Sequence, residues 1–430
     1  MAKRSNMKDF SLYLNTLKEL ISFKSCNQTA TENAPFGLEN KKALEFFLNT
    51  ANQMGFETKN YDNYIGEVIF GEGQEIGIIG HLDVVPIGLG WESDPFTLTE
   101  KEDKLYARGI SDDKAPLLSC LFALKELKES GISPKRKFRL IAGCDEETGW
   151  RDVAYLKTKT TLPEYGFSPD GNFPLSYAEK GMYEITFTVP VSFSIKSIKG
   201  GTVVNAVCDY AQASVSDNFV EDDLIKKYGL SLKNDNVIES FGKAAHGSTP
   251  HLGKNAIKPL LEYLCEKGED LSRVVDVLFC DVLEVGKMQN EQGFVTFSPD
   301  LISLENGVLK ITCDCRIPAP FTIDEVMAKF NSCGLAVSVK ERHPPVMVEK
   351  NGFFVQTLLD AHDSVLNVKS EPLSMGGSTF ARAFNKGCAF GPAFNGYENN
   401  IHDANENESK ENLITAYKIY KKAIFDLATK

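Results

Sequence analysis

Apolar and polar positions fall into blocks along the first third of the chain, and each block has the period of one kind of element. Apolar side chains recur at helical spacing from residue 8 to residue 23, with Phe10, Leu14 and Leu17 on one face. Hydrophobic strands are predicted for Glu67–Phe70, Ile76–Gly80 and Phe138–Cys144, and a second helix for Ala115–Glu129. Strands separated by helices predict a largely parallel α/β sheet.

The pattern changes after residue 180. Tyr183–Val189 alternates like a half-exposed strand, and Ile311–Arg316 resumes strand character after a long mixed stretch. Pro344-Pro345 cannot continue a helix or a central strand, so it marks the end of this block. The sequence therefore predicts an α+β domain of residues 181–344, inserted into a first domain of residues 1–180 and 345–430. The first domain resumes with a helix at Phe353–Leu366 and a late strand at Ala389–Gly391.

Composition narrows the class of protein. The net charge of -12 gives no electrostatic footprint for nucleic acid, and it suits a protein that holds cations on carboxylates. No stretch approaches the roughly 18 consecutive apolar residues of a membrane span, so no membrane partner is expected. The 10 cysteines are spaced irregularly, which favours reduced thiols and a cytoplasmic location over a disulfide framework.

Imidazole and carboxylate groups gather where the predicted strands end. His81 and Asp83 directly follow the apolar run Ile76–Gly80, and alternation along a strand points both side chains the same way. A carboxylate beside a histidine is the usual orienting partner of a metal-bound imidazole, although so short a pair also arises by chance.

Four further polar clusters follow along the chain. Asp112-Asp113 precedes a predicted helix, where a helix cap would explain the pair equally well. Asp145-Glu146-Glu147 ends a predicted strand, and three adjacent like charges repel one another unless water screens them or a cation neutralises them. Asp170 lies in a segment that is typical of an ordinary turn, and His402 in one that is typical of an exposed loop.

Together these clusters predict a metal site. Open α/β sheets bind ligands outside the carboxyl ends of their parallel strands, and two of the clusters lie there. Imidazole and carboxylate suit Zn²⁺, and two histidines with several acids exceed the ligand set of one tetrahedral ion. We therefore expect two zinc ions per chain, about 3.5–4 Å apart and bridged by a carboxylate, in a site that could also hold Mn²⁺ or Co²⁺.

Five motifs also occur in the order found in a known family. The chain resembles the peptidase V type of dipeptidase in Gly80–Pro86, Ala107–Lys114 and Asp145–Trp150, and the motifs that contain Asp170 and His402 follow in order. That type belongs to the dinuclear zinc exopeptidases and deacylases, which include aminoacylase and carboxypeptidase G. The resemblance runs from about His81 to His402. It implies a zinc-exopeptidase-like catalytic domain, with a mostly parallel sheet flanked by helices, and an inserted α+β lid domain at residues 181–344.

The resemblance implies a role for each clustered residue. Asp112 would bridge both ions, and the Asp112–Asp113 peptide bond would be cis. Glu146 would be the general base, and Asp83 would orient the first histidine. The remaining implied ligands are His81 and Asp170 on one ion, and Glu147 and His402 on the other.

The inserted block also resembles the family, in segments whose side chains reach the substrate. Asn205 would contact the substrate, and His246 would stabilise the oxyanion. Arg316 would hold the substrate's terminal carboxylate through its planar bidentate donor. Each side chain also has a plainer interpretation: Asn205 as a turn residue, His246 as a surface histidine and Arg316 as half of an ion pair.

Two positions depart from the family pattern. Ser378 stands in the glycine-rich loop that would close the carboxylate pocket, at a position where the family has glycine. Asp403 follows the histidine ligand, where relatives more often carry an uncharged residue. Both departures leave the substrate choice open.

The implied activity is hydrolysis of the peptide bond of dipeptides by a hydroxide that bridges two zinc ions, with Glu146 as the base. An N-acyl amino acid or N-succinyl diamino acid deacylase would use the same metal chemistry. A non-catalytic, metal-dependent binding protein is the third alternative, but it would not need Glu146. The expected partner is a dipeptide or related small molecule, and a monomer is favoured over a homodimer.

Overall fold

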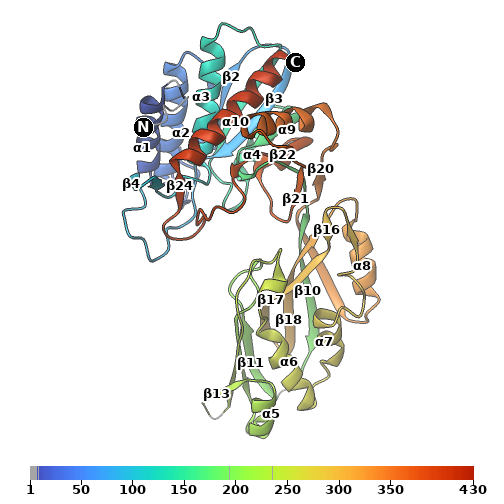
Figure 1. The fold of residues 1–430 in the computed structure, drawn as a ribbon. Helices are drawn as coiled ribbons and strands as arrows, with labels where there is room; N and C mark the ends of the chain where they lie inside the picture. The colour runs from blue at the N-terminus through green and yellow to red at the C-terminus, as the bar shows by residue number, and fades with distance from the viewer. Residues whose placement is uncertain (1–6, 8, 193, 235) are drawn as a thin grey trace. The chain divides into compact units, whose positions relative to one another are not determined.

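The computed structural model describes residues 7, 9–192, 194–234 and 236–430, which form two compact units (Figure 1). The first unit consists of Met1–Tyr177, Met347–Leu373 and Ser378–Lys430, and the second of Ala178–Val346 and Ser374–Gly377. Residues 374–377 therefore belong to the second unit, whereas the predicted boundaries placed them in the first domain.

A sheet with a parallel centre forms the core of the first unit. The strands β6, β3, β7 and β22 are neighbours in this order, and each pairs with the next in parallel. The strands β1 and β2 extend one edge antiparallel, and β9, β20 and β21 extend the other. The bounds are β1 Glu57–Tyr61, β2 Ile65–Phe70, β3 Gln74–His81, β6 Arg136–Gly143, β7 Tyr165–Ser168, β9 Ser176–Glu179, β20 Val346–Met347, β21 Leu373–Met375 and β22 Lys386–Ala389.

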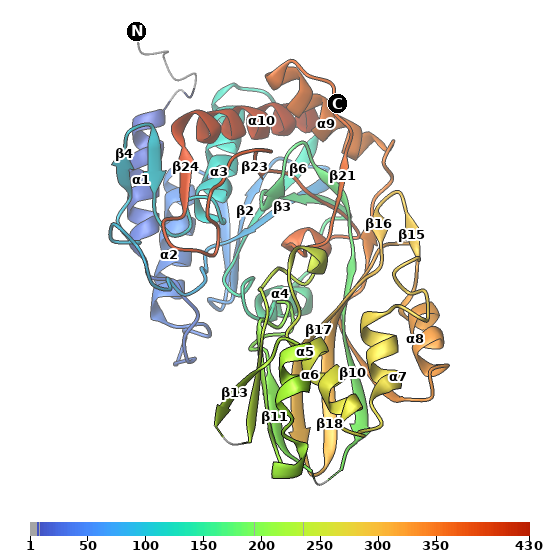
Figure 2. The same cartoon turned by 60° about the horizontal axis from the view of Figure 1, so that its bottom comes forward.

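Helices cover both faces of this sheet, as Figure 2 shows for α3 and α10 on one face. On the opposite face, Val153 and Leu156 of α4 pack against Ile79 of β3 and Ile141 of β6. The helices of this unit are α1 Phe10–Ser22, α2 Leu38–Gln53, α3 Lys114–Glu129, α4 Arg151–Lys159, α9 Phe353–Leu366 and α10 Lys410–Thr429, with the short helix η3 Phe380–Ala383. The predicted α/β class is confirmed.

Strand β3 explains why this sequence forms a strand buried on both faces. Ile76, Ile78 and Ile79 are fully buried, as a continuous apolar run requires. A Cβ atom on Gly77 would lie 2.2 Å from the ring of Phe384, so the glycine lets that ring reach the sheet. The strand ends at His81, at the carboxyl edge of the parallel centre.

Smaller strands of the first unit lie near the chain's last loop. β24 (Asn407–Ser409) pairs antiparallel with β5 (Lys104–Tyr106), and β5 pairs with β4 (Thr99–Lys101). β23 (Pro392–Ala393) pairs in parallel with β8 (Gly171–Asn172). The pairing of β24 with β5 ties the segments before Asp112 and after His402 into one layer.

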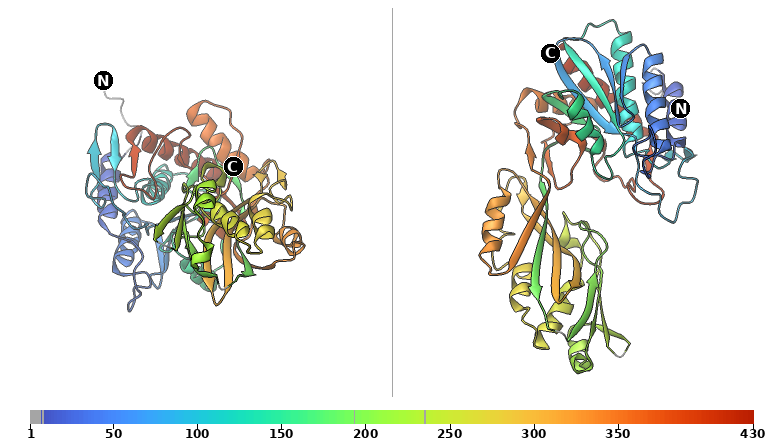
Figure 3. Two further views of the ribbon diagram at one scale, coloured as in Figure 1. Left: turned by 90° about the horizontal axis from the view of Figure 1, so that it is seen from below. Right: turned by 180° about the vertical axis from the view of Figure 1, so that it is seen from behind.

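The second unit is an antiparallel sheet covered by helices on one face, where α6, α7 and α8 pack (Figure 3). Its strand order is β13-β14-β12-β11-β17-β18-β10-β19. The strands are β10 Gly181–Pro190, β11 Ile195–Gly200, β12 Tyr210–Val215, β13 Ser231–Asn234, β14 Val237–Phe241, β17 Thr296–Glu305, β18 Val308–Ile317 and β19 Ala336–His343. The helices are η1 Asp217–Phe219, α5 Asp222–Lys227, η2 Pro250–Leu252, α6 Ile257–Glu266, α7 Ser272–Phe279 and α8 Ile323–Asn331; β15 (Gln289–Asn290) and β16 (Gly293–Phe294) form a separate ribbon.

Most predicted elements lie within observed ones, and their ends differ by a few residues. The first helix begins at Phe10, while residue 8 of its predicted range lies outside the described residues. The late strand β22 ends at Ala389, so the prediction placed it too far along the chain. Among the described residues, none of the helices combines the length and the apolar character that crossing a bilayer requires. All 10 cysteines are free thiols.

Candidate metal centre

His81 presents one ring nitrogen to a group of carboxylates at the end of β3. Its Nδ1 lies 2.9 Å from the backbone carbonyl of Asp83, and a carbonyl oxygen only accepts, so Nδ1 carries the hydrogen. The lone pair of Nε2 is therefore free to bind a cation. Nε2 lies 2.9 Å from Asp112 Oδ1 and 3.7 Å from Asp170 Oδ2, and it makes no hydrogen bond with the described residues.

Asp112 faces two histidines, one with each carboxylate oxygen. Its Oδ2 lies 2.9 Å from Nε2 of His402, opposite the contact of Oδ1 with His81. His402 Nε2 also lies 3.3 Å from Glu147 Oε1. Two ligands of a tetrahedral zinc ion, each about 2.1 Å from it, lie about 3.4 Å apart, so these separations fit shared cations. The Asp112–Asp113 peptide bond is cis, as the resemblance implied.

Two groups of ligand atoms are compact enough to hold a cation, because within each group all atoms lie within 4.8 Å of one another. The groups are His81 with Asp112 and Glu147, and His81 with Glu146 and Asp170. The first group combines ligands that the prediction assigned to different ions, and the second includes the predicted base. The structure therefore brings all the predicted metal-centre residues together, while the division between two ions stays a prediction.

The acidic groups of this cluster resist ionisation. Burial, followed by the carboxylate of Asp112, raises the pKa of Glu147 to about 7. The same two causes raise the pKa of Asp170 above its usual range. Burial and the neighbouring carboxylates also hold the pKa of Glu146 well above its usual range. Crowded acids with raised pKa values indicate a strong negative potential.

The pKa values of the two imidazole groups also indicate a negative potential. Hydrogen bonds with Asp112 and Glu147 raise the pKa of His402 to about 11. Burial lowers the pKa of His81, but its contacts with Asp112, Asp170 and Asp83 outweigh burial and raise it. Both histidines are thus held where a positive charge is favoured, which is the environment of a cation site.

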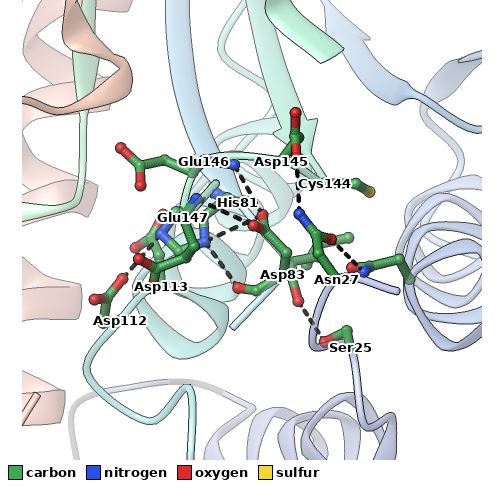
Figure 4. A network of polar contacts seen from close by, with 12 residues as sticks. Ser25, Asn27, His81, Asp83, Asp112, Asp113, Cys144, Asp145, Glu146 and Glu147 are labelled. Carbon is green, nitrogen blue, oxygen red and sulfur yellow. Dashed lines mark hydrogen bonds and ion pairs between the residues drawn. The ribbon is translucent and has the colours of Figure 1, made fainter. Parts of the chain in front are cut away.

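The side chain of Asp83 positions the segment that carries the predicted base. Its two carboxylate oxygens accept hydrogen bonds from the backbone N–H groups of Glu146 and Glu147, each at 3.2 Å (Figure 4). Its Oδ1 lies 3.5 Å from Nδ1 of His81, which is longer than the bond that the Asp83 carbonyl makes. The backbone of Asp83 therefore orients the histidine, and its carboxylate holds the neighbouring loop.

Three acids to which the sequence interpretation gave no role lie around the site. Asp113 is fully buried and accepts a hydrogen bond from the backbone N–H of His81 at 3.2 Å. Asp145 accepts from Asn27 Nδ2 at 2.8 Å and so turns away from the ligands (Figure 4). Glu406 is fully buried and contacts the segment before Asp112. The sequence could have pointed to Asp113 and Asp145, because both lie inside the acidic motifs. For Glu406 the sequence offered only its position near His402.

The second unit brings together two of the predicted substrate residues. The backbone N–H of Gly247 donates to the carbonyl of Asn205 at 2.6 Å, beside His246. His246 Nδ1 lies 2.6 Å from the hydroxyl of Ser248. Their contact with a substrate stays a prediction.

Arg316 and Ser378 lie in different surroundings. Arg316 is buried, and its Nε donates to Asp314 Oδ2 at 2.8 Å while its Nη1 donates to the Gly376 carbonyl at 3.1 Å. Ser378 belongs to the first unit, and its Oγ is buried without a hydrogen bond among the described residues. Two residues later, the ring of Phe380 packs edge-on against His81 at 6.2 Å between centroids, so this loop borders the metal centre.

Comparison with known proteins agrees with this cluster of ligands. The model of peptidase family M20/M25/M40 matches residues 77–426, which is most of the chain. The chain belongs to this family. It is therefore a hydrolase of the metallopeptidase type, and the expected resemblance is confirmed.

Individual proteins that are similar to this chain match nearly its whole length. A protein of Staphylococcus aureus (strain MW2) that carries a provisional dipeptidase name is 32% identical, over 96% of each chain. Human carnosine dipeptidase 1 has a similar fold, with a TM-score of 0.62 at 14% identity over 98% of this chain and 96% of its own. The Bacillus subtilis YXEP protein, described as a dinuclear metal binding peptidase from the M20 family, has a TM-score of 0.55 at 10% identity over 98% and 99%. The two solved structures confirm the predicted fold class, an α/β catalytic domain with an inserted α+β domain.

Proposed function

We propose that this M20 hydrolase is a dipeptidase whose centre holds two zinc ions. The observation that carries the proposal is the position of Asp112, whose two oxygens each lie 2.9 Å from Nε2 of a different histidine. A carboxylate placed between two imidazoles suits a bridge between two cations. The description of the Bacillus subtilis relative as a dinuclear metal binding peptidase supports the same number of ions.

The ligands would divide as the resemblance implied. His81 and Asp170 would hold one ion, Glu147 and His402 the other, and Asp112 both. When bound, two zinc ions would supply a hydroxide nucleophile at neutral pH and polarise the scissile carbonyl. Imidazole and carboxylate donors suit zinc, although Mn²⁺ and Co²⁺ accept the same donors.

Glu146 would move the proton in this reaction. Its carboxylate lies with His81 and Asp170 in one group of atoms within 4.8 Å, next to the predicted ligands. Asp83 holds the backbone N–H of Glu146 at 3.2 Å, so the base stands on a fixed segment. Glu146 would accept a proton from water and return it to the leaving amine.

Substrate recognition would come from the second unit and from the loop at Ser378. Arg316 offers a buried guanidinium for the terminal carboxylate of a peptide, and His246 a ring nitrogen for the oxyanion. The provisional dipeptidase name of the relative at 32% identity favours a dipeptide over an N-acyl amino acid. We further propose that the protein is a monomer. We also propose a cytoplasmic location, which the 10 free thiols support.

The test is hydrolysis of a dipeptide panel and an N-acyl amino acid panel, after chelation and after zinc is restored. Zinc-dependent cleavage of dipeptides that Glu146→Gln abolishes, with two zinc ions bound per chain, is the expected result. Glu371→Gln is the control, because Glu371 pairs with Lys350 on the surface, away from the ligands. Cleavage of the acyl panel alone would overturn the dipeptidase proposal in favour of a deacylase, and inactivity on both panels would favour a binding protein.

A further inference from the structure

One fully buried carboxylate near the metal centre has no part in the proposed chemistry. Glu406 follows His402 by four residues, and its side chain is completely shielded from solvent. Burying a carboxylate costs much free energy unless hydrogen-bond donors surround it.

The donors around Glu406 come from the segment that leads into Asp112. Arg108 Nη1 donates to Oε2 at 2.7 Å, and the backbone N–H of Gly109 lies 3.1 Å from both oxygens. The N–H groups of Ser111 and Asp112 donate to Oε1 at 2.9 and 3.3 Å. One side chain therefore holds the backbone of the predicted bridging ligand itself.

Further bonds join the same two segments. Arg108 Nη2 donates to the Asp403 carbonyl at 3.2 Å, beside His402. The hydroxyl of Ser111 donates to the Asn407 carbonyl at 3.1 Å. These contacts continue the pairing of β24 with β5 as far as the two ligands.

The loop that carries His402 needs such an anchor. His402 and Asn405 have φ values of 65° and 60°, in the left-handed region, so the loop between them is irregular and forms no ladder. Glu406 is the first residue after this loop whose side chain reaches the segment of Asp112.

We infer that Glu406 is a positioning residue, which fixes His402 relative to Asp112 and thereby sets the affinity of the cation that these two ligands share with Glu147. The inference rests on the proposed function only in requiring that the cluster binds metal. Asp112 would serve both cations, but His81 and Asp170 stand on β3 and after β7, away from the segments that Glu406 joins, so the other cation site keeps two of its three ligands in place.

The test compares zinc binding by Glu406→Gln and by wild-type protein, measured by competition with a chromophoric chelator. A glutamine keeps the size of the side chain but turns an NH₂ group towards N–H donors. Outer partners of metal ligands typically change affinity by about 10–100-fold. We expect that loss at the site of His402 and Glu147, and a clearly smaller loss at the site of His81 and Asp170, which shares only Asp112 with it.

Glu408→Gln is the matched control. Glu408 is also buried and lies two residues later, on β24, but its carboxylate accepts from Ser409 N–H at 2.7 Å, on the side of α10 and not of Asp112. This variant should leave both zinc affinities unchanged. If Glu406 served stability alone, Glu406→Gln and Glu408→Gln would both lower the thermal midpoint of the metal-free protein. The ratio of the affinities of the two zinc sites would then be the same in Glu406→Gln as in the wild-type protein.

A second variant covers the case in which Glu406→Gln does not fold. Arg108→Lys keeps the positive charge but removes the planar fork that joins Glu406 and Asp403, so the same site should weaken several-fold. Equal affinities in wild-type, Glu406→Gln and Arg108→Lys proteins would overturn the inference alone. Absence of zinc binding in the wild-type protein would overturn the proposed function instead.

Discussion

Asp83→Asn separates the two tasks of Asp83, because one belongs to its backbone and the other to its side chain. The backbone carbonyl that accepts from His81 Nδ1 at 2.9 Å survives the substitution. The carboxylate that accepts from the N–H groups of Glu146 and Glu147 at 3.2 Å does not. We therefore expect the histidine to keep its orientation while the segment with the base shifts.

The size of the effect follows from the two altered acceptor bonds. A hydrogen bond to a charged group contributes about 1.5–3 kcal/mol, and the asparagine retains one oxygen but turns an NH₂ group towards the second N–H. Since Asp83 is fully buried, no water replaces the lost bond. We expect the free energy of unfolding to fall by about 2–4 kcal/mol, and kcat to fall by about 10–100-fold at saturating zinc.

The assay pairs urea unfolding with dipeptide hydrolysis, and Asp152→Asn is the control. Asp152 is equally buried and accepts from the N–H groups of Cys144 and Asp145 at 2.7 and 3.0 Å, just before the base. That variant should keep kcat within about threefold. Unchanged kcat in Asp83→Asn, or an equal loss of kcat in both variants, would refute the separate role of the Asp83 carboxylate.

Three further predictions address cation binding, substrate binding and pH. Zinc at about 100 times its Kd should stabilise the wild-type protein by about 2.7 kcal/mol for each zinc site, measured as a rise in thermal midpoint, and His402→Ala should lose part of that gain. Arg316→Lys should raise KM for dipeptides by at least about 10-fold with a smaller change in kcat, since lysine lacks the bidentate fork; an unchanged KM would exclude Arg316 from the carboxylate pocket. Burial raises the pKa of Asp300 to about 8, so the folded state holds a proton that the unfolded chain loses near pH 4. The free energy of unfolding should therefore fall between those values as pH rises, by at most about 1.4 kcal/mol per unit, and urea unfolding of Asp300→Asn should show a flatter slope.

The sequence predicted β3 and its ligand well because the physical signal was local. A strand buried on both faces must be apolar throughout, and Ile76, Ile78 and Ile79 are all fully buried. The chain then reaches His81 at the edge where parallel strands end. The resemblance to the dinuclear exopeptidases supplied the remaining ligands, which spacing alone left ambiguous.

The supporting acids were beyond sequence reasoning because their partners are distant in the chain. Alternation along a strand would place Asp145 and Glu147 on one side, but β6 ends at Gly143 and the chain turns there. Asp145 then pairs with Arg151 and Asn27 instead of the ligands. Glu406 looked like one more acid of an exposed loop, since nothing in the sequence joins it to Ser111.

A shared arrangement links three of the predicted ligands. Each donates its own backbone N–H to a buried carboxylate: His81 to Asp113 at 3.2 Å, Asp112 to Glu406 at 3.3 Å, and Glu147 to Asp83 at 3.2 Å. A backbone carbonyl could accept the same hydrogen bonds without a negative charge. Buried carboxylates instead fix the ligand backbones and add to the negative potential of the cluster, at a desolvation cost that a bound divalent cation would offset. The geometry and the charge of the site therefore depend on the same side chains, which is why the neutral, isosteric variants Asp83→Asn and Glu406→Gln test both.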